Sequence, residues 1–260
     1  MSLRRGASGA LQAYVLHRYD WSETSLIVEL FTRERGRLAV AAKGAKRPYS
    51  QLRGVLLPFQ RLQVSLGRSA DDASAEVHTL RAAEWAGGAP MPGGGALFSA
   101  FYLNELLLRL LARQDPHAGL FDTYAQVLPL LVGADDARVQ AALRAFELSL
   151  LRETGLLPEL GCVTLTLQPL RADASYALRP EAGLAAALAD EPSLAGAHWV
   201  ALQAALEHGS VEALCAQCLR SLPALRAGLR TLLQYHLAST QLRTRQVMTD
   251  VRRLLAPSRP

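Results

Sequence analysis

The two lysines of this chain, Lys43 and Lys46, lie three residues apart in the segment KGAKRP, beside Arg47. All other basic residues among the 28 Lys and Arg residues of the 260-residue chain are arginines. Three cations within five residues, with Gly44 and Ala45 between the lysines, create a strongly positive loop that a phosphate can approach closely. These residue types suit the binding of a polyanion. The alternative is a solvated loop whose charge serves solubility.

The basic character extends to both sides of this segment. Residues 33–53 contain one acidic residue, Glu34, and seven basic ones: Arg33, Arg35, Arg37, Lys43, Lys46, Arg47 and Arg53. Tyr49 and Phe59 lie close by in the sequence. Small β-barrels bind single-stranded nucleic acids through a basic groove in which aromatic rings stack on the bases. We therefore predict that these seven residues contact nucleic acid.

Paired cysteines occur once, in the motif CAQC at Cys215 and Cys218, while Cys162 stands alone. A structural zinc site usually takes four ligands, and a redox pair belongs where a strand enters a helix. Here both thiols share a helical face with apolar residues, which favours buried thiols. The sparse, odd count of cysteines fits a reducing compartment.

Motifs of catalysis are missing from the sequence. GxSxG, GxxxxGK[ST], GxGxxG and HExxH do not occur, and the six histidines show no zinc spacing. The adjacent carboxylates Asp71-Asp72 and Asp135-Asp136 lie in polar turns, where turn or capping roles outweigh metal binding. We therefore expect no enzyme, no metal site and no cofactor.

Charge is unevenly distributed along the chain. Residues 1–85 carry a net charge of +5, residues 86–219 of −7 and residues 220–260 of +7. Two basic regions flanking an acidic one indicate a polyanionic partner. The second basic region adds candidate nucleic-acid contacts: Arg226, Arg230, Arg243 and Arg245. No apolar run is long enough to span a bilayer, and the first residues show no signal peptide, so we expect a cytoplasmic protein with no membrane partner.

The first part of the chain is typical of a β-barrel. Residues 1–85 contain five short apolar and β-branched runs, which predict an OB-fold (oligonucleotide-binding) barrel that binds nucleic acid. Residues 86–95, with the segment GGAPMPGGG, predict a linker. The fold class is therefore α+β and multidomain.

Helical periodicity dominates residues 96–260. We expect Asp136 and Ser210 to cap helices, Gly155 to end one, and Pro223 to lie in a first helical turn. VTLTLQ and SYALRP alternate with period two, which predicts a β-hairpin inserted at about 160–182.

Several segments together resemble the RecO family of bacterial DNA repair proteins. Its N-terminal patterns appear as SETS at 22–25, FTRERGR at 31–37, AKGAK at 42–46 and LPF at 57–59. Three further segments resemble the helices of the family: FYLNELLLRLLARQDPHAGLFDTY, ALRAFELSLLRETG and LRTLLQYHLASTQLRTRQV. The similarity therefore covers nearly the whole chain. Many members carry two CxxC pairs in a zinc module after the second of these helices, where this chain has only Cys162. We expect a metal-free hairpin in its place.

The resemblance implies a recombination mediator. Such a protein binds single- and double-stranded DNA, anneals complementary strands, and acts with RecR on DNA coated by single-stranded DNA-binding protein (SSB) to load RecA. It also implies that the acidic C-terminal tail of SSB docks on the helical domain through a cation and an apolar pocket. The candidates for that site are Arg144, Arg109, Arg113, Phe146 and Leu150.

Two other functions fit parts of the sequence. One is an OB-fold RNA-binding or ribosome-associated factor, which competition between RNA and DNA would distinguish. The other is a nuclease, which needs a cluster of carboxylates that the sequence does not present.

Overall fold

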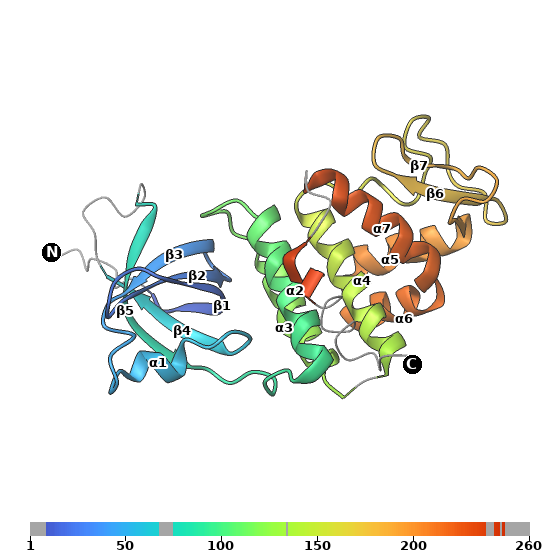
Figure 1. The fold of residues 1–260 in the computed structure, drawn as a ribbon. Coiled ribbons are helices and arrows are strands. Elements are labelled where there is room, and N and C mark those ends of the chain that lie inside the picture. Colours follow the sequence, from blue (N-terminus) through green and yellow to red (C-terminus); the bar gives the residue numbers. More distant parts are fainter. Residues whose placement is uncertain (1–8, 68–74, 134, 238–241, 245, 248–260) are drawn as a thin grey trace, which may run out of the picture. The chain divides into compact units, whose positions relative to one another are not determined.

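The computed structural model describes residues 9–67, 75–133, 135–237, 242–244 and 246–247 (Figure 1). The chain forms two compact units. The first comprises residues 1–91 and 111–125, and the second comprises residues 92–110 and 126–260. Residues 111–125 therefore group with the barrel, although they follow the first long helix in the sequence.

The first unit contains a closed five-stranded barrel with the strand order β1-β2-β3-β5-β4. Its strands are β1 (Leu11–Asp20), β2 (Leu26–Thr32), β3 (Gly36–Ala42), β4 (Arg61–Leu66) and β5 (Val77–Trp85). All pairs are antiparallel except β3 with β5. Closure leaves no unpaired edge. The OB-like barrel that the sequence predicts, followed by helices, is confirmed.

Alternation along the strands places one set of side chains inside the barrel. This core includes Val15, Leu30, Val40, Leu62 and Val64, all at most 1% exposed. The short helix α1 (Gln51–Val55) lies between β3 and β4, and its Leu52 and Val55 pack against the core. The basic loop and α1 are therefore fixed to one end of the barrel.

A second hydrophobic cluster lies on the outside of the barrel. Tyr14 on β1 and Phe31 on β2 pack against Phe121 and Tyr124 of α3 (Ala118–Leu130), with ring centroids 5.0–6.3 Å apart. Gly36 permits a close approach nearby, since an added Cβ would lie 1.8 Å from the Asp115 carbonyl oxygen. These contacts explain why residues 111–125 belong to the barrel unit.

The second unit is mainly helical. It comprises α2 (Gly94–Leu110), the end of α3, α4 (Asp136–Glu153), α5 (Gly196–His208), α6 (Val211–Arg220) and α7 (Leu222–His236). The central helix α4 packs against α2, α6 and α7. Its N-cap is Asp135, whose carboxylate accepts from the Arg138 amide at 2.8 Å, so the prediction of Asp136 as the cap is wrong by one residue.

Other predicted helix boundaries are confirmed. The Ser210 hydroxyl accepts from the Ala213 amide at the start of α6, and Pro223 lies in the first turn of α7. Gly155 follows α4 with a φ of 70°. These signals are local, which is why the sequence alone locates them.

The inserted hairpin lies later than expected. Its strands are β6 (Ser175–Arg179) and β7 (Gly183–Ala186), and β8 (Leu194–Ala195) pairs with the other edge of β6. Residues 164–166 of VTLTLQ form a turn instead of a strand. Thr164 explains the difference, because its hydroxyl accepts a hydrogen bond from the Leu184 amide of β7. The segment around Thr164 therefore contacts the hairpin from outside and is not one of its two strands.

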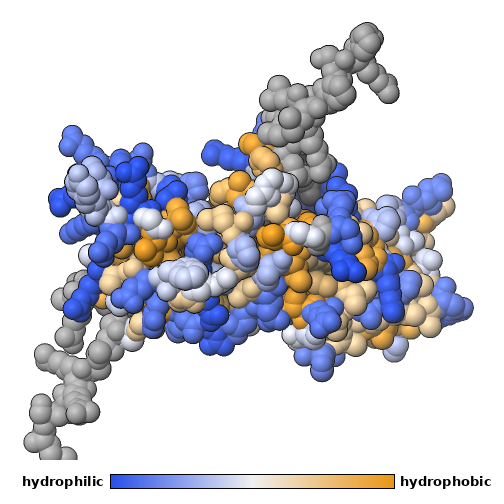
Figure 2. All heavy atoms as spheres, turned by 90° about the horizontal axis from the view of Figure 1, so that it is seen from below, coloured by the Kyte–Doolittle hydropathy of each residue, from blue (hydrophilic) through white to orange (hydrophobic). Residues whose placement is uncertain are grey.

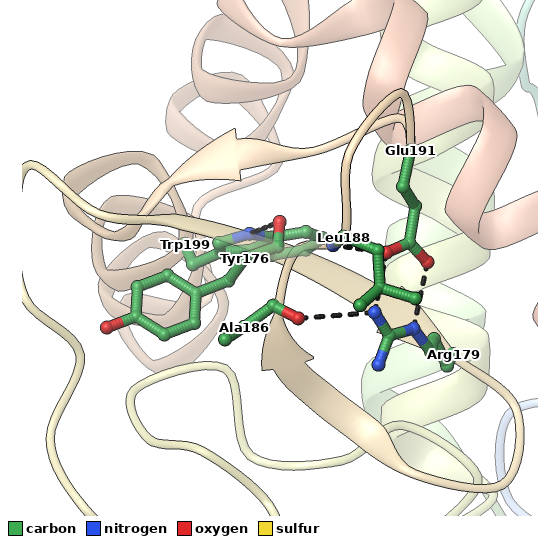
Figure 3. Close-up of polar contacts among 6 residues, drawn as sticks. All are labelled: Tyr176, Arg179, Ala186, Leu188, Glu191 and Trp199. Carbon is green, nitrogen blue, oxygen red and sulfur yellow. Dashed lines mark hydrogen bonds and ion pairs between the residues drawn. The ribbon is translucent and has the colours of Figure 1, made fainter.

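Side-chain contacts hold this hairpin together (Figure 3). The Arg179 guanidinium donates to both carboxylate oxygens of Glu191 at 2.9 and 2.6 Å, and the Leu188 amide donates to the same carboxylate. The Trp199 indole donates to the Tyr176 carbonyl oxygen at 3.1 Å, which ties β6 to α5. No helix in the described part of the chain is long and apolar enough to cross a membrane.

Candidate nucleic-acid interface

The basic loop begins where three strand ends meet. The pairing register places Asp20 of β1 beside Leu26 of β2, and Leu26 beside Ala42 of β3. Lys46 ties the loop to the β1–β2 turn: its amide donates to Thr24 O at 2.9 Å and its ammonium donates to Ser22 O at 3.1 Å. Its ammonium also lies 3.2 Å from the Asp20 carboxylate. Lys46 therefore stabilises the loop in addition to charging it.

Lys43 and Arg47 extend into solvent from this anchored loop. Among the described residues, neither side chain has an acidic partner within ion-pairing distance. Gly44 between them has a φ of 70°, and the Arg47 side chain lies beside it. An exposed lysine and arginine without carboxylate partners are free to bind a phosphate.

A basic hollow adjoins the loop. It has a volume of about 450 Å³, and Arg18, Lys46 and Arg53 line it together with Asp20 and the apolar side chains of Leu26, Ala45, Leu52 and Leu56. Arg18 was not among the predicted contacts. It lies at the end of β1, more than twenty residues before the loop, and donates to the Leu56 carbonyl oxygen at 3.2 Å. Only the folded barrel brings it beside Arg53.

Aromatic side chains surround the same end of the barrel. Tyr19, Trp21 and Tyr49 are exposed, and Tyr49 is completely so. Phe59, by contrast, is 1% exposed and has a φ of 66°, so its ring is not available to stack on bases although it lies near Tyr49 in the sequence. In Figure 2, seen from the side on which α1 lies in Figure 1, hydrophilic residues gather over the barrel with hydrophobic ones between them.

Three of the predicted DNA contacts lie at the β2–β3 turn, away from the loop. The Arg33 guanidinium donates to both oxygens of the Asp122 carboxylate at 2.9 Å. Arg37 lies 3.8 Å from Glu29, which Arg113 also contacts, and burial lowers the pKa of Arg37. Arg35 is half-buried in the same turn. Arg33 and Arg37 thus already have carboxylate partners inside the barrel unit.

The helical unit presents the second set of predicted DNA contacts. Arg226 and Arg230 are exposed one turn apart on α7. Arg243 is exposed, and its amide and that of Thr244 donate to the Glu105 carboxylate. Burial alone would raise the pKa of Glu105, but the hydrogen bond from the Thr244 hydroxyl, those from the two amides and the charge of Arg109 lower it. Arg245 lies outside the described residues.

The residues expected to bind the SSB tail are mostly interior. Arg144 is 3% exposed and donates to Glu147 at 2.6 Å, while Phe146 and Leu150 are fully buried. This burial argues against Arg144 as the cation of an exposed site. Arg109 and Arg113 are more accessible, but they are paired with Glu105 and Glu29. The sequence could not distinguish these cases, because α4 is buried on nearly every face.

The cysteines do not gather into a site. Cys215 and Cys218 lie on α6, and Cys162 precedes the hairpin. Burial raises the pKa of Cys215 to about 11 and that of Cys218 further, so both thiols stay protonated at neutral pH. Over the described residues, no group of three or more His, Cys, Asp and Glu side chains is placed to hold a metal ion.

Comparison with known proteins agrees with this architecture. Residues 10–88 match the family described as Recombination protein O N terminal, and residues 93–246 match Recombination protein O C terminal. The chain belongs to the RecO family. The DNA repair protein RecO of Variovorax paradoxus (strain S110) is 54% identical over 251 residues, and that of Verminephrobacter eiseniae (strain EF01-2) is 53% identical over 244. Each match covers 93% of this chain and 96% of the relative.

Membership of the RecO family confirms the resemblance read from the sequence. The first match ends at residue 88, after β5, and the second begins at residue 93, just before α2. Both basic surfaces described above therefore fall within the matched parts of a RecO-family chain.

Proposed function

We propose that this RecO-family chain is a DNA repair and recombination mediator that binds DNA and catalyses no reaction on it. Its family and its relatives, which are named DNA repair proteins, support a role in DNA repair and recombination. The observation that carries the proposal is the end of the barrel where Arg18, Lys43, Arg47 and Arg53 lie close to exposed aromatic rings.

This arrangement suits single-stranded DNA for two physical reasons. Lysine and arginine side chains neutralise phosphates whatever the base sequence, and aromatic rings stack on bases that are not paired. Annealing adds a further requirement, because two polyanions approach each other only when much of their charge is neutralised. The exposed arginines of α7 would supply a second cationic surface for the second strand or for duplex DNA.

The finer function that we propose follows the RecO resemblance. The protein would anneal complementary strands coated with SSB and, with RecR, help to load RecA, acting in the cytoplasm on nucleoid DNA. The SSB tail would dock on the chain through an exposed cation. Arg109 or Arg113 serves this role better than Arg144, and the terminal carboxylate of the tail would then compete with Glu105 or Glu29.

The decisive experiment measures annealing of SSB-coated complementary oligonucleotides with and without the protein. We expect faster annealing without ATP and without cleavage of either strand. Annealing at the uncatalysed rate would contradict the proposal. Competition between matched DNA and RNA single strands addresses the alternative of an RNA-binding factor: a clear preference for RNA would favour that alternative.

We also propose that the protein works without zinc. Only Cys162 precedes the hairpin, and the thiols on α6 are held protonated by burial. Elemental analysis of protein purified without chelator should show no stoichiometric metal, and a chelator should leave the unfolding temperature unchanged. One zinc per chain would contradict this proposal.

A further inference from the structure

A second hollow adjoins α1 in the barrel unit. It has a volume of about 600 Å³, and its lining includes Gly54, Val55, Gln60, Trp85 and Met91. None of these side chains carries a charge. Residues of α1 and its C-terminal end line both this groove and the basic hollow described above: Gly54 and Val55 face the groove, whereas Leu52 and Arg53 face the basic hollow. The two hollows are therefore neighbours.

Trp85 is the main side chain of this groove. It ends β5, the residue is 66% exposed, and its indole Nε1 donates to Gln60 Oε1 at 3.1 Å. The hydrogen bond fixes the orientation of the ring, so a ligand that stacks on it would lose little additional conformational entropy. Met91 beside it is also exposed. Trp85 and Met91 therefore leave apolar surface open to a ligand on this side of the barrel.

A nucleobase fits this groove better than a protein side chain. The groove is open, flat at the indole and uncharged, and the Gln60 amide can bond to the edge of a base. The cations Arg53, Arg18 and Lys46 lie in the neighbouring hollow, at the place where the phosphates of the same strand would run. Alternation of cations with stacking rings is the usual way of holding a single strand.

We propose that Trp85 and Gln60 form a base-binding subsite for single-stranded DNA, adjacent to the phosphate-binding cations of the barrel. This inference rests on the proposed function and names one of its contacts. Base stacking contributes affinity only when a base is present, whereas the cations bind phosphates with or without bases. The two contributions can therefore be separated by the choice of oligonucleotide.

The test compares a fluorescently labelled oligo-dT with an abasic oligonucleotide of the same length and charge, using fluorescence anisotropy and the full-length protein. Trp85→Ala should weaken binding of oligo-dT about tenfold, the range expected for one stacked base. It should change binding of the abasic strand less than twofold and leave the salt dependence unaltered. Trp85→Phe, the matched control, keeps an aromatic face and should retain most of the affinity.

A second variant narrows the groove while leaving Trp85 itself unchanged. At Gly54 an added Cβ meets no atom within 4 Å, so Gly54→Leu should fold and produce the same selective loss for oligo-dT. Equal weakening of both oligonucleotides, or an effect of only one variant, would overturn the subsite. Salt-dependent binding that neither variant changes would overturn this inference and leave the proposed function standing. Failure of the wild-type chain to bind any oligonucleotide would instead overturn the proposed function.

Discussion

Among the basic side chains of segment 33–53, some are exposed and others are paired with carboxylates in the folded chain. Lys43, Arg47 and Arg53 are exposed near the end of the barrel. Arg33 and Arg37 bind carboxylates within the barrel unit. Because both classes look alike in the sequence, composition alone could not show which cations are available to a ligand.

The two aromatic residues of this region, Tyr49 and Phe59, differ in the same way, since Tyr49 is exposed and Phe59 is buried. Tyr49→Ala should change the free energy of unfolding by less than about 0.5 kcal/mol, as is usual for an exposed site, while it weakens binding of single-stranded DNA. Phe59→Ala should destabilise the fold by about 3–5 kcal/mol, because it leaves a cavity at a buried position. Urea unfolding measures both effects. A stable Phe59→Ala variant with weaker DNA binding would contradict the assignment.

The double variant Lys43→Ala, Arg47→Ala tests the loop as a phosphate-binding element. Each phosphate contact on a single strand contributes about 0.7 to the slope of log affinity against log salt, so the slope should fall by about 1.4. All sequences should weaken alike, since phosphate contacts carry no base information. The matched control is Arg138→Ala, Arg171→Ala, which removes two exposed arginines elsewhere. Equal slopes for the two double variants would show that the loop is only solvated.

At the scale of elements, the sequence predicted what local patterns determine. Strand alternation, the turn at Gly36 and the caps at Ser210 and Gly155 depend on neighbouring residues, so they located the barrel and most helix ends. The position of the hairpin depends on a contact twenty residues apart, between Thr164 and Leu184, which no local pattern reveals. The same holds for the site, because Arg18 and Trp85 reach α1 only through barrel closure.

The hairpin depends on the ion pair between Arg179 and Glu191. The hydrogen bonds from Arg179 and from the Leu188 amide lower the pKa of Glu191 from 4.5 to about 2. Because this folded-state pKa lies below that of the unfolded chain, the stabilisation is fully present above about pH 4.5 and is lost as the pH falls through about 2.

Thermal unfolding of the wild type and of Glu191→Gln across this pH range tests the ion pair. The wild type should be more stable at pH 6, and the difference should shrink steadily as the pH falls from about 4.5 towards 2. Glu181→Gln, which changes an exposed glutamate in the same hairpin, should show no such dependence. A difference between wild type and Glu191→Gln that stays constant with pH would contradict the role of the charge.

At the scale of the whole molecule, positive charge is carried by two separate units. The barrel unit has the loop and the hollow at α1, and the helical unit has the exposed arginines of α7. Binding one strand requires one cationic surface, whereas annealing requires that two strands be held at once. The annealing rate of the intact chain should therefore depend on both surfaces together, whereas binding of one strand needs only one of them.

Variants of the two surfaces in the full-length chain test this difference. Lys43→Ala, Arg47→Ala alters the barrel, and Arg226→Ala, Arg230→Ala alters α7. Each should still bind oligonucleotides, with a reduced salt slope, because the other surface remains. Each should nevertheless anneal complementary strands at least about tenfold more slowly, since one strand can no longer be neutralised while the other is held. Two outcomes would mean that the barrel alone brings the strands together. One is an annealing rate that falls only in proportion to the binding affinity, and the other is an unchanged annealing rate in the α7 variant.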